Sequence, residues 1–281
     1  MISLKTIKNQ YIKSLSELYP EEESKNIFYL TAANLLHYSK SDCFLYEEKI
    51  IDFKLFNITL DELLTGKPIQ QILGFTYFYD LKIAVNEHTL IPRPETEELV
   101  NILLNRNKNQ QPIILDLCTG SGCIALALKA QIKNAIVYGV DISADALELA
   151  NKNANSLDLE VQFIQQNILE EAFTEKTKMA TIWVSNPPYV LHSEKKTMHK
   201  NVLNYEPHLA LFTPIDAPIL FYKKIINDWI TSGALELYME LNPLTTSILK
   251  NYLNTCNLQN TAVEICTDFN NKERFLILTK R

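Results

Sequence analysis

Residues 116–122 read Asp-Leu-Cys-Thr-Gly-Ser-Gly, and they join a short apolar run, 113–117, to a helical run that begins at Cys123. Two of the six glycines of the chain, Gly120 and Gly122, lie in this turn, so the backbone requires a conformation or a close approach that a Cβ atom would obstruct. A strand, a glycine turn and a helix N-terminus in this order hold a nucleotide-like ligand at the carboxyl end of a sheet. The stretch therefore predicts an α/β fold with a ligand site at the turn.

Short apolar runs continue to alternate with helical stretches, such as 144–153 and 218–230, towards the C-terminus. The alternation predicts a mostly parallel sheet that is covered on both faces. The first five expected strands are residues 113–117, 135–140, 161–164, 181–184 and 235–241. Two final runs, 262–267 and 274–279, are separated only by a turn, so one of the last strands is expected to run antiparallel.

The first eighty or so residues predict a small helical module. Apolar residues recur at near-helical spacing up to Pro20, which can also be the first residue of the next helix. Residues 59–62 (Thr-Leu-Asp-Glu) fit a capping box, which predicts a short helix over about 60–65. Residues 75–85 are aromatic and β-branched and indicate a hairpin. We expect three parts: a helical domain over residues 1–74, a β-hairpin linker over 75–92 and an α/β domain over 93–281.

Composition excludes several classes of protein. The chain has 281 residues, of which 47% are hydrophobic and 21% charged, enough for one small and one large domain. Its start mixes lysine into apolar residues, and no apolar run approaches the roughly 20 residues of a membrane helix, so we expect a soluble, cytoplasmic protein. A net charge of −6 argues against a protein that gains its affinity for nucleic acid by contacting many phosphates. Neither the five cysteines nor the five histidines have metal-binding spacing, so no metal site is predicted.

Three interpretations of the glycine turn remain open. Residues 120–125 (Gly-Ser-Gly-Cys-Ile-Ala) satisfy the dinucleotide fingerprint with alanine in third place. Residues 116–122 instead resemble the acid-x-Gly-x-Gly-x-Gly loop of the S-adenosylmethionine methyltransferases, and the third interpretation is a tight turn without a ligand. The Asp116 carboxylate would repel a pyrophosphate but suits the ammonium group of a methionine moiety. Asp141 follows about 20 residues after the turn, where a carboxylate can accept both ribose hydroxyls.

A second motif, Asn186-Pro187-Pro188-Tyr189, closes the fourth expected strand. Consecutive prolines lack N–H groups and have fixed φ, so the loop accepts hydrogen bonds rather than donating them. The side-chain oxygen of Asn186 and the carbonyl of Pro187 could each accept one N–H of a planar NH2 group, and Tyr189 offers a flat ring beside it. Such acceptors strengthen as positive charge builds on the nitrogen, which favours methylation of an amide-type nitrogen. An ordinary strand-ending turn could also carry two prolines.

Three further segments make the resemblance more specific. They are residues 68–74 (Pro-Ile-Gln-Gln-Ile-Leu-Gly), 90–97 (Leu-Ile-Pro-Arg-Pro-Glu-Thr-Glu) and 205–211 (Tyr-Glu-Pro-His-Leu-Ala-Leu). Together with the two loops they resemble the release factor glutamine methyltransferases, the PrmC/HemK family, over nearly the whole chain. The resemblance implies a helical N-terminal domain that contacts the protein substrate, a hairpin linker and a Rossmann-like catalytic domain with seven strands.

The resemblance also implies a reaction and its participants. The reaction is N5-methylation of the glutamine in the Gly-Gly-Gln motif of class I peptide chain release factors. The methyl donor is S-adenosyl-L-methionine, the product is S-adenosyl-L-homocysteine, and no metal takes part. The expected partners are the release factors, with no stable nucleic-acid partner and no membrane.

Individual residues inherit roles from the same resemblance. The expected cofactor-binding residues are Asp116, Cys118, Thr119, Gly120, Ser121, Gly122, Asp141, Asn167, Ile168 and Asn186. The glutamine would be received by Asn186, Pro187, Pro188 and Tyr189, among which Asn186, Pro187 and Tyr189 are the predicted catalytic residues. Cys118 stands where the family often has glycine. A cysteine is tolerable at this position only if its φ is negative, so we expect a negative φ at Cys118. Asn167 stands where aspartate is common, and residues 216–218 (Asp-Ala-Pro) replace Asp-Gly-Leu.

Two alternative functions remain open. A nucleic-acid amino-methyltransferase uses the same Asn-Pro-Pro-Tyr loop on adenine or guanine but usually lacks the three further segments. A non-catalytic translation-factor-binding module would keep the fold but would not need an intact loop. Among the other polar residues, Glu206 and His208 are interpreted as parts of the active-site wall, and the acidic residues at 95–98 as a helix N-terminus. Arg93 is expected either to touch the cofactor carboxylate or to form a structural salt bridge.

Overall fold

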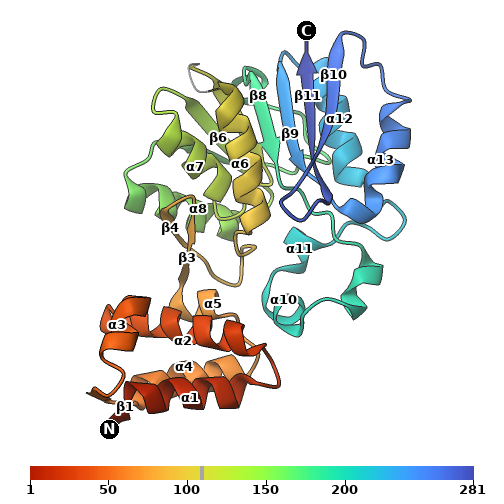
Figure 1. Ribbon diagram of the computed structural model, residues 1–281. Helices are drawn as coiled ribbons and strands as arrows, with labels where there is room; N and C mark the ends of the chain where they lie inside the picture. The colour runs from red at the N-terminus through yellow and green to blue at the C-terminus, as the bar shows by residue number, and fades with distance from the viewer. Residues whose placement is uncertain (108–110) are drawn as a thin grey trace. The chain divides into compact units, whose positions relative to one another are not determined.

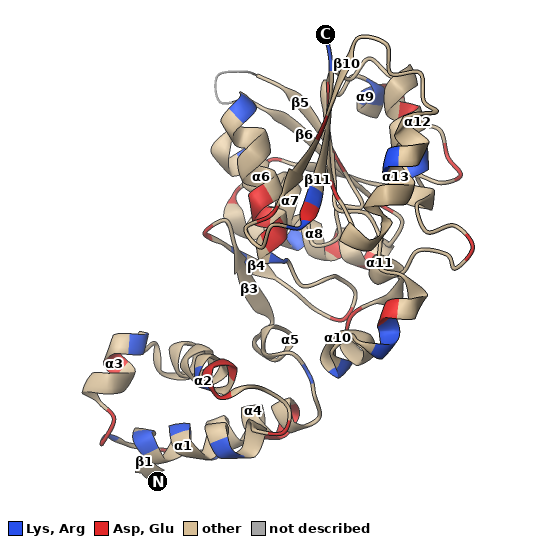
Figure 2. Ribbon diagram, turned by 45° about the vertical axis from the view of Figure 1, so that its right-hand side comes forward, with Lys and Arg blue, Asp and Glu red and all other residues tan. Residues whose placement is uncertain are grey.

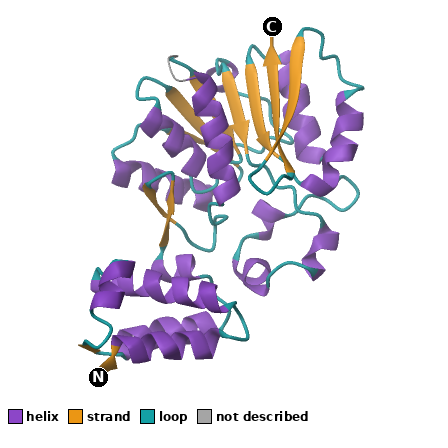
Figure 3. Ribbon diagram, in the orientation of Figure 1, coloured by secondary structure: helices purple, strands orange, loops and turns teal. Residues whose placement is uncertain are grey.

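The computed structural model describes residues 1–107 and 111–281. Contacts divide the chain into two units. Unit 1 comprises Met1–Phe75 and Met198–Tyr205, and unit 2 comprises Thr76–Thr197 and Glu206–Arg281. Figure 3 shows unit 1 as largely helical and unit 2 as a sheet flanked by helices. Within the described ranges, no helix combines the length and apolar character needed to cross a membrane.

Unit 1 is a bundle of helices around an aromatic core. The ring of Tyr11 packs edge-on against Phe28 and Phe56, at centroid distances of 5.8 and 6.1 Å. The Tyr11 hydroxyl donates to the Phe56 carbonyl (2.7 Å), so its polar end is satisfied inside the core. The elements of unit 1 are β1 (Ile2–Ser3), α1 (Leu4–Leu15), α2 (Glu21–Leu36), α3 (Lys40–Leu45), β2 (Ile50–Ile51), α4 (Lys54–Leu64), α5 (Ile69–Leu73) and α10 (Lys200–Tyr205). Pro20 is the N-cap of α2 and not its predicted first residue.

The structure corrects the predicted helix over 60–65. α4 starts well before this range because Phe56, Leu60 and Leu63 lie at helical spacing and pack into the core. Thr59 therefore lies inside the helix, where its hydroxyl donates to a carbonyl of the preceding turn (3.3 Å). The predicted capping box does not form.

Unit 2 contains a seven-stranded sheet, which confirms the α/β prediction. The strand order is β10-β11-β9-β8-β5-β6-β7, and β11 runs antiparallel to both of its neighbours. The strands of this sheet are β5 (Ile113–Leu117), β6 (Ile136–Asp141), β7 (Gln162–Gln165), β8 (Ile182–Ser185), β9 (Glu236–Glu240), β10 (Thr261–Thr267) and β11 (Glu273–Lys280). Each expected strand is confirmed to within one residue at either end.

Helices cover both faces of this sheet, as predicted. Ile114 belongs to a core shared with α6 and α7, whereas its neighbours Leu115 and Leu117 belong to a core shared with α12 and α13. Figure 1 shows these two pairs of helices on opposite sides of the sheet. The helices of unit 2 are α6 (Pro94–Asn107), α7 (Cys123–Gln131), α8 (Ala144–Leu157), α9 (Glu175–Lys178), η1 (His192–Lys196), α11 (His208–Leu211), α12 (Leu220–Thr231), η2 (Pro243–Thr245) and α13 (Thr246–Leu253). The predicted hairpin is formed by β3 (Phe75–Phe78) and β4 (Leu81–Ala84).

The register of the parallel strands brings four loops to one edge of the sheet. Leu117 at the end of β5 lies opposite Val140 on β6 and Ser185 on β8, and Ser185 lies opposite Met239 on β9. The segments that follow these strands therefore emerge side by side, although they are far apart in sequence.

A short segment within the second half of the chain belongs to unit 1. The Tyr205 hydroxyl donates to the carbonyl (3.0 Å) and the hydroxyl (2.8 Å) of Thr65, and Gln71 Nε2 donates to the Tyr205 carbonyl (2.9 Å). The rings of His199 and Tyr19 are stacked, with centroids 5.7 Å apart. The chain thus leaves unit 2 after Thr197 and returns at Glu206.

Candidate active site

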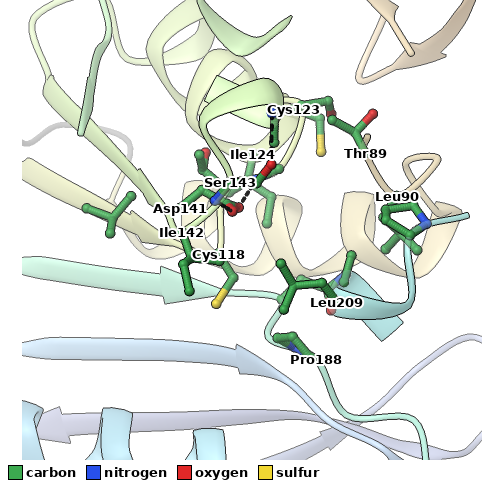
Figure 4. A pocket seen from close by; sticks show the side chains of 18 of the residues that line it. Thr89, Leu90, Cys118, Cys123, Ile124, Asp141, Ile142, Ser143, Pro188 and Leu209 are labelled. Carbon is green, nitrogen blue, oxygen red and sulfur yellow. Dashed lines mark hydrogen bonds between the residues drawn. The ribbon is translucent and has the colours of Figure 1, made fainter. Parts of the chain in front are cut away.

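A cavity of about 250 Å³ lies at the carboxyl edge of the sheet in unit 2. Its walls come from the segment before α6, from the loops after β5, β6, β7 and β8, and from α11. In Figure 4, Cys118, Asp141 and Ile142 lie on one side of the cavity, and Leu209 and Pro188 lie on the other. The cavity is therefore formed at the place where the glycine turn predicts a ligand site.

The glycine turn has a left-handed backbone at three positions. The φ angles are +61° at Cys118, +54° at Gly120 and +80° at Gly122. The expectation of a negative φ at Cys118 is wrong, because the turn imposes the same left-handed conformation there that glycine would adopt. This conformation costs a residue with a Cβ atom roughly 1–2 kcal/mol. At Gly122, an added Cβ would lie only 2.9 Å from the ring of Phe163.

Asp116 lies beneath the turn and is not among the residues that line the cavity. Its Oδ2 accepts from the Thr119 hydroxyl (2.5 Å) and from the backbone N–H of Ala125 (3.2 Å), which joins the turn to the first residues of α7. Burial raises the pKa of Asp116 to about 7. Its Oδ1 is buried and has no partner within the described chain. This oxygen is enclosed beneath the turn, and Asp116 does not reach the cavity wall.

Asp141 stands at the end of β6 and lines the cavity. Its Oδ2 accepts from the backbone N–H of Gly120 (2.8 Å), and its Oδ1 accepts from the backbone N–H of Ser143 (3.0 Å). Burial raises its pKa, and the two backbone bonds oppose this shift. Each oxygen keeps a second lone pair, so the carboxylate is held in a fixed orientation and can still accept from a ligand.

The loop after β7 supplies the next part of the wall. Asn167 Oδ1 accepts from the backbone N–H of Leu169 (3.1 Å), and Ile168 is buried beside it. Gln166 also lines the cavity; its Nε2 donates to the Ala172 carbonyl (2.9 Å), but its Oε1 is buried without a partner. A buried acceptor without a partner is costly, so Gln166 Oε1 is a candidate acceptor for a donor group in the cavity.

The Asn-Pro-Pro-Tyr loop is held in place by the end of β9. Asn186 Nδ2 donates to the Thr96 hydroxyl (3.0 Å), which donates to Glu240 Oε2 (2.7 Å). The Tyr189 hydroxyl donates to the other oxygen of Glu240 (2.8 Å), and Asn242 Nδ2 donates to the Tyr189 carbonyl (3.0 Å). Burial raises the pKa of Glu240, and the two hydroxyl bonds lower it. The backbone and the side chains of the loop are thus anchored together.

The segment before α6 and the segment before α11 are joined by a salt bridge. Arg93 Nη2 lies 2.5 Å from Glu206 Oε1, and Glu206 Oε2 accepts from the backbone N–H of Ile91 (3.1 Å). Arg93 therefore forms the salt bridge that was one of its two expected roles, and Glu206 is a buried part of the wall. The ring of His208 packs edge-on against Phe212.

The structure brings most of the predicted site residues to one cavity. Those that line it are Cys118, Thr119, Gly120, Ser121, Asp141, Asn167, Ile168, Asn186 and Pro188. Asp116, Gly122, Pro187 and Tyr189 lie outside the lining.

Sequence reasoning missed Thr96, Gln166, Glu240 and Asn242 as parts of the site. Glu240 could have been noticed, because two glutamates, Glu236 and Glu240, interrupt the apolar run 235–241, and a carboxylate in a strand is rarely buried without a specific partner. Nothing in the local pattern distinguishes the other three from ordinary polar residues.

Three comparisons relate the chain to known proteins. A model of the family "Methyltransferase small domain" matches residues 95–208. A release factor glutamine methyltransferase of Flavobacterium psychrophilum is 39% identical over 274 residues, which cover 93% of this chain and 94% of the relative. The protein of the same name from Bacteroides thetaiotaomicron is 38% identical over 240 residues, which cover 83% of this chain and 85% of the relative.

Solved structures show the same fold. The N-terminal domain of human METTL16 in complex with SAH matches with a TM-score of 0.52 and 15% identity, over 72% of this chain and 77% of that chain. The METTL16 catalytic domain in complex with an RNA hairpin from the MAT2A 3′UTR matches with a TM-score of 0.55 and 17% identity, over 72% of this chain and 75% of that chain. At such low identity the likeness concerns the fold alone, which confirms the Rossmann-like prediction.

Proposed function

Because the chain belongs to the family of release factor glutamine methyltransferases, we propose that it methylates N5 of the glutamine in the Gly-Gly-Gln motif of class I peptide chain release factors. One observation carries this proposal beyond family membership. A single cavity combines the glycine turn, the oriented Asp141 carboxylate and the Asn186 carboxamide. The first two features suit a nucleoside-bearing cofactor, and the third suits a planar amide.

The cavity residues fit S-adenosyl-L-methionine as the methyl donor. Asp141 has lone pairs for the ribose hydroxyls, Asn167 and Ile168 flank the region proposed for the adenine, and Gln166 Oε1 is a buried acceptor without a partner. The backbone at residues 118–122 would accommodate the methionine end, with the unpartnered Asp116 Oδ1 beneath it. When bound, the cofactor supplies a methyl group on a sulfonium centre.

The Asn-Pro-Pro-Tyr loop would orient the glutamine. Among the hydrogen bonds of the described residues, none ends on Asn186 Oδ1 or on the Pro187 carbonyl. These two oxygens would accept the two N–H groups of the substrate amide, and the Tyr189 ring would pack beside its plane. Asn186 lines the cavity, whereas Pro187 and Tyr189 lie outside its lining, so their two contacts rest on the family resemblance. The amide nitrogen is a weak nucleophile because its lone pair is delocalised, so the acceptors act by stabilising the positive charge that develops during transfer. The alkylated nitrogen has become acidic and then loses one proton to solvent water.

We also propose that residues 1–74 recognise the release factor, with residues 75–92 as the linker to the catalytic domain, residues 93–281. Within this last range, residues 198–205 belong to unit 1. Because a release factor works at the ribosome, we also propose that this protein is located in the cytoplasm. Figure 2 shows basic residues spread over several helices, including α1, α3, α6 and α13. With a net charge of −6, this distribution gives no support to a nucleic-acid substrate.

One experiment tests the substrate. The purified protein is incubated with methyl-labelled cofactor and with a release factor, the same factor lacking the Gly-Gly-Gln glutamine, duplex DNA or ribosomal RNA. We expect label on the release factor alone, and only when the glutamine is present. Label on nucleic acid would replace the proposal with the first alternative function. Cofactor binding without any transfer would favour the non-catalytic module.

A variant tests the role of the loop. Asn186→Ala should lower kcat by about 10²- to 10³-fold, as the removal of one preorganised hydrogen bond does in other enzymes. Cofactor affinity, measured by calorimetry, should change little because the glycine turn and Asp141 stay intact. An unchanged kcat would remove Asn186 from the mechanism.

A further inference from the structure

We infer that Thr96 and Glu240 are positioning residues that fix which end of the Asn186 carboxamide faces the substrate. The inference rests on the proposed function, because it concerns how Asn186 receives the glutamine amide. Thr96 lines the cavity and Glu240 does not, but both would act through Asn186.

Both oxygens of Glu240 act as hydrogen-bond acceptors. One accepts from the Thr96 hydroxyl (2.7 Å) and the other from the Tyr189 hydroxyl (2.8 Å). The hydroxyl of Thr96 has one proton, which it donates in the hydrogen bond to Glu240. The Thr96 oxygen can then act towards Asn186 only as an acceptor.

The Thr96 oxygen determines how the Asn186 carboxamide is turned. A carboxamide presents either an NH2 group or an oxygen to a neighbour, and an acceptor selects the NH2 group. Nδ2 therefore faces Thr96 (3.0 Å), and Oδ1 faces the other way. No hydrogen bond of the described chain uses Oδ1, and Asn186 lines the cavity, so this oxygen remains available to a ligand.

The hydrogen-bonded side chains of Thr96, Glu240 and Asn186 are held rigidly. Side chains of Thr96 and Glu240 are buried, with 2% and 1% of each residue exposed, so water does not compete for these bonds. Thr96 lies in the first turn of α6, Glu240 is the last residue of β9, and Asn186 directly follows β8, which pairs with β9. Regular elements thus hold Thr96 and Glu240, and Asn186 is the first residue after one. We call these three hydrogen-bonded residues the relay.

The orientation determines which atom of the glutamine amide is bound. With Oδ1 presented, the site accepts an N–H and so directs the amide nitrogen towards the methyl donor. If the carboxamide were reversed, two NH2 groups would face each other, and the site would instead favour the amide oxygen of the substrate. The relay therefore selects nitrogen over oxygen as the atom that is held for methylation.

The test compares variants of Thr96 with a matched control. Thr96→Val removes the hydroxyl at nearly constant volume, and we expect kcat to fall by about 10- to 100-fold while cofactor affinity stays within about twofold. Thr96→Ser restores a hydroxyl and should keep kcat within about threefold of wild type. Thr177→Val removes another buried threonine hydroxyl, on α9, and should leave kcat unchanged. A kcat near wild type in Thr96→Val, or an equal loss in Thr96→Ser, would overturn the inference.

A double-mutant cycle separates positioning from a general structural role. In an Asn186→Ala background there is no carboxamide to orient, so adding Thr96→Val should cost no further activity. An undiminished further loss would show that Thr96 acts by another route. If the valine variant does not fold, Thr96→Ala serves in the same cycle.

A measurement on the wild-type protein needs no folded variant of Thr96. In NMR spectra, one Asn186 Hδ2 proton should exchange slowly with solvent because it is bonded to Thr96. Free exchange of both protons would contradict the relay. This outcome differs from a failure of the proposed function, in which the protons would be protected but no release factor would be methylated.

Discussion

At the scale of single residues, the site depends on polar atoms that the fold buries and then only partly satisfies. Asp116 is the clearest case, because one carboxylate oxygen holds the glycine turn while the other has no partner in the described chain. The left-handed Cys118 is a second case, in which a residue with a Cβ atom occupies a conformation suited to glycine. Both features cost stability in the ligand-free protein, which is typical of binding sites.

Asp116 should make stability depend on pH. Its pKa is about 7 in the folded protein and about 3.8 in the unfolded chain. Between these values the folded protein holds a proton that the unfolded chain has lost, so the free energy of unfolding falls as pH rises through this range. Asp116→Asn keeps an acceptor for Thr119 and Ala125 and removes the titration. Relative to this variant, the free energy of unfolding of wild type should fall by on the order of 4 kcal/mol between about pH 4 and 8.

Urea unfolding at several pH values measures this difference, and the exposed Asp216→Asn controls for the substitution. Parallel stability curves for wild type and Asp116→Asn would show that the carboxyl is already ionised in the folded protein at low pH.

A side chain at position 122 should destabilise the folded protein. Its φ of +80° is unfavourable for alanine, and the added Cβ would meet the Phe163 ring at 2.9 Å. We expect Gly122→Ala to lower the free energy of unfolding by about 2–3 kcal/mol. Gly233→Ala is the matched control, because no atom lies within 4 Å of its added Cβ, and it should change stability by less than about 0.5 kcal/mol. Equal effects in the two variants, measured by urea unfolding, would refute the steric argument.

At the scale of elements, the site is a set of loop ends that separate contacts hold together. Glu240 and Asn242 at the end of β9 hold the Asn-Pro-Pro-Tyr loop, and the ion pair between Arg93 and Glu206 joins two wall segments. The strands supply a rigid base because their register is fixed by two buried faces. Such loops need few bonds of their own to keep a defined geometry.

The ion pair at the wall should matter more than a surface pair. Arg93→Ala leaves the Glu206 carboxylate buried, with its side chain 1% exposed, and only one backbone donor remains. We expect a loss of about 1–3 kcal/mol in the free energy of unfolding and a weaker affinity for the cofactor, since both wall segments line the cavity. Arg106→Ala breaks a pair with Glu264 in which both side chains are partly exposed, and it should cost at most about 1 kcal/mol. Comparable losses in both variants would argue against a special role for the wall pair.

At the scale of the whole molecule, the chain is divided in a way that does not follow its linear order. Residues Met198–Tyr205 come from the second half of the sequence but belong to unit 1 with the N-terminal helices. Hydrogen bonds from Tyr205 to Thr65 and the stacked rings of His199 and Tyr19 account for this assignment. The chain therefore connects the two units at three points rather than one.

Tyr205→Phe should loosen this segment. The variant loses two hydrogen bonds to Thr65, for a net cost of about 1 kcal/mol, which corresponds to roughly fivefold faster amide exchange. Hydrogen-exchange mass spectrometry should show the increase in residues 198–205 and no change in the strands of unit 2. Tyr46→Phe, an exposed tyrosine of unit 1, is the control. An unchanged exchange rate in residues 198–205 would mean that the ring packing alone holds the segment.

The sequence by itself determined the features that depend on neighbouring residues. Alternating apolar runs specified the strands, the glycine turn marked the ligand edge of the sheet, and the two prolines defined a loop that accepts hydrogen bonds. These follow from backbone conformation and periodicity, which act over a few residues. Only the tertiary structure decided that Asp116 is buried beneath the turn, that Cys118 is left-handed and that Thr96 meets Glu240 beside Asn186. Strand register and helix packing bring these distant groups together, and no local pattern encodes such a meeting.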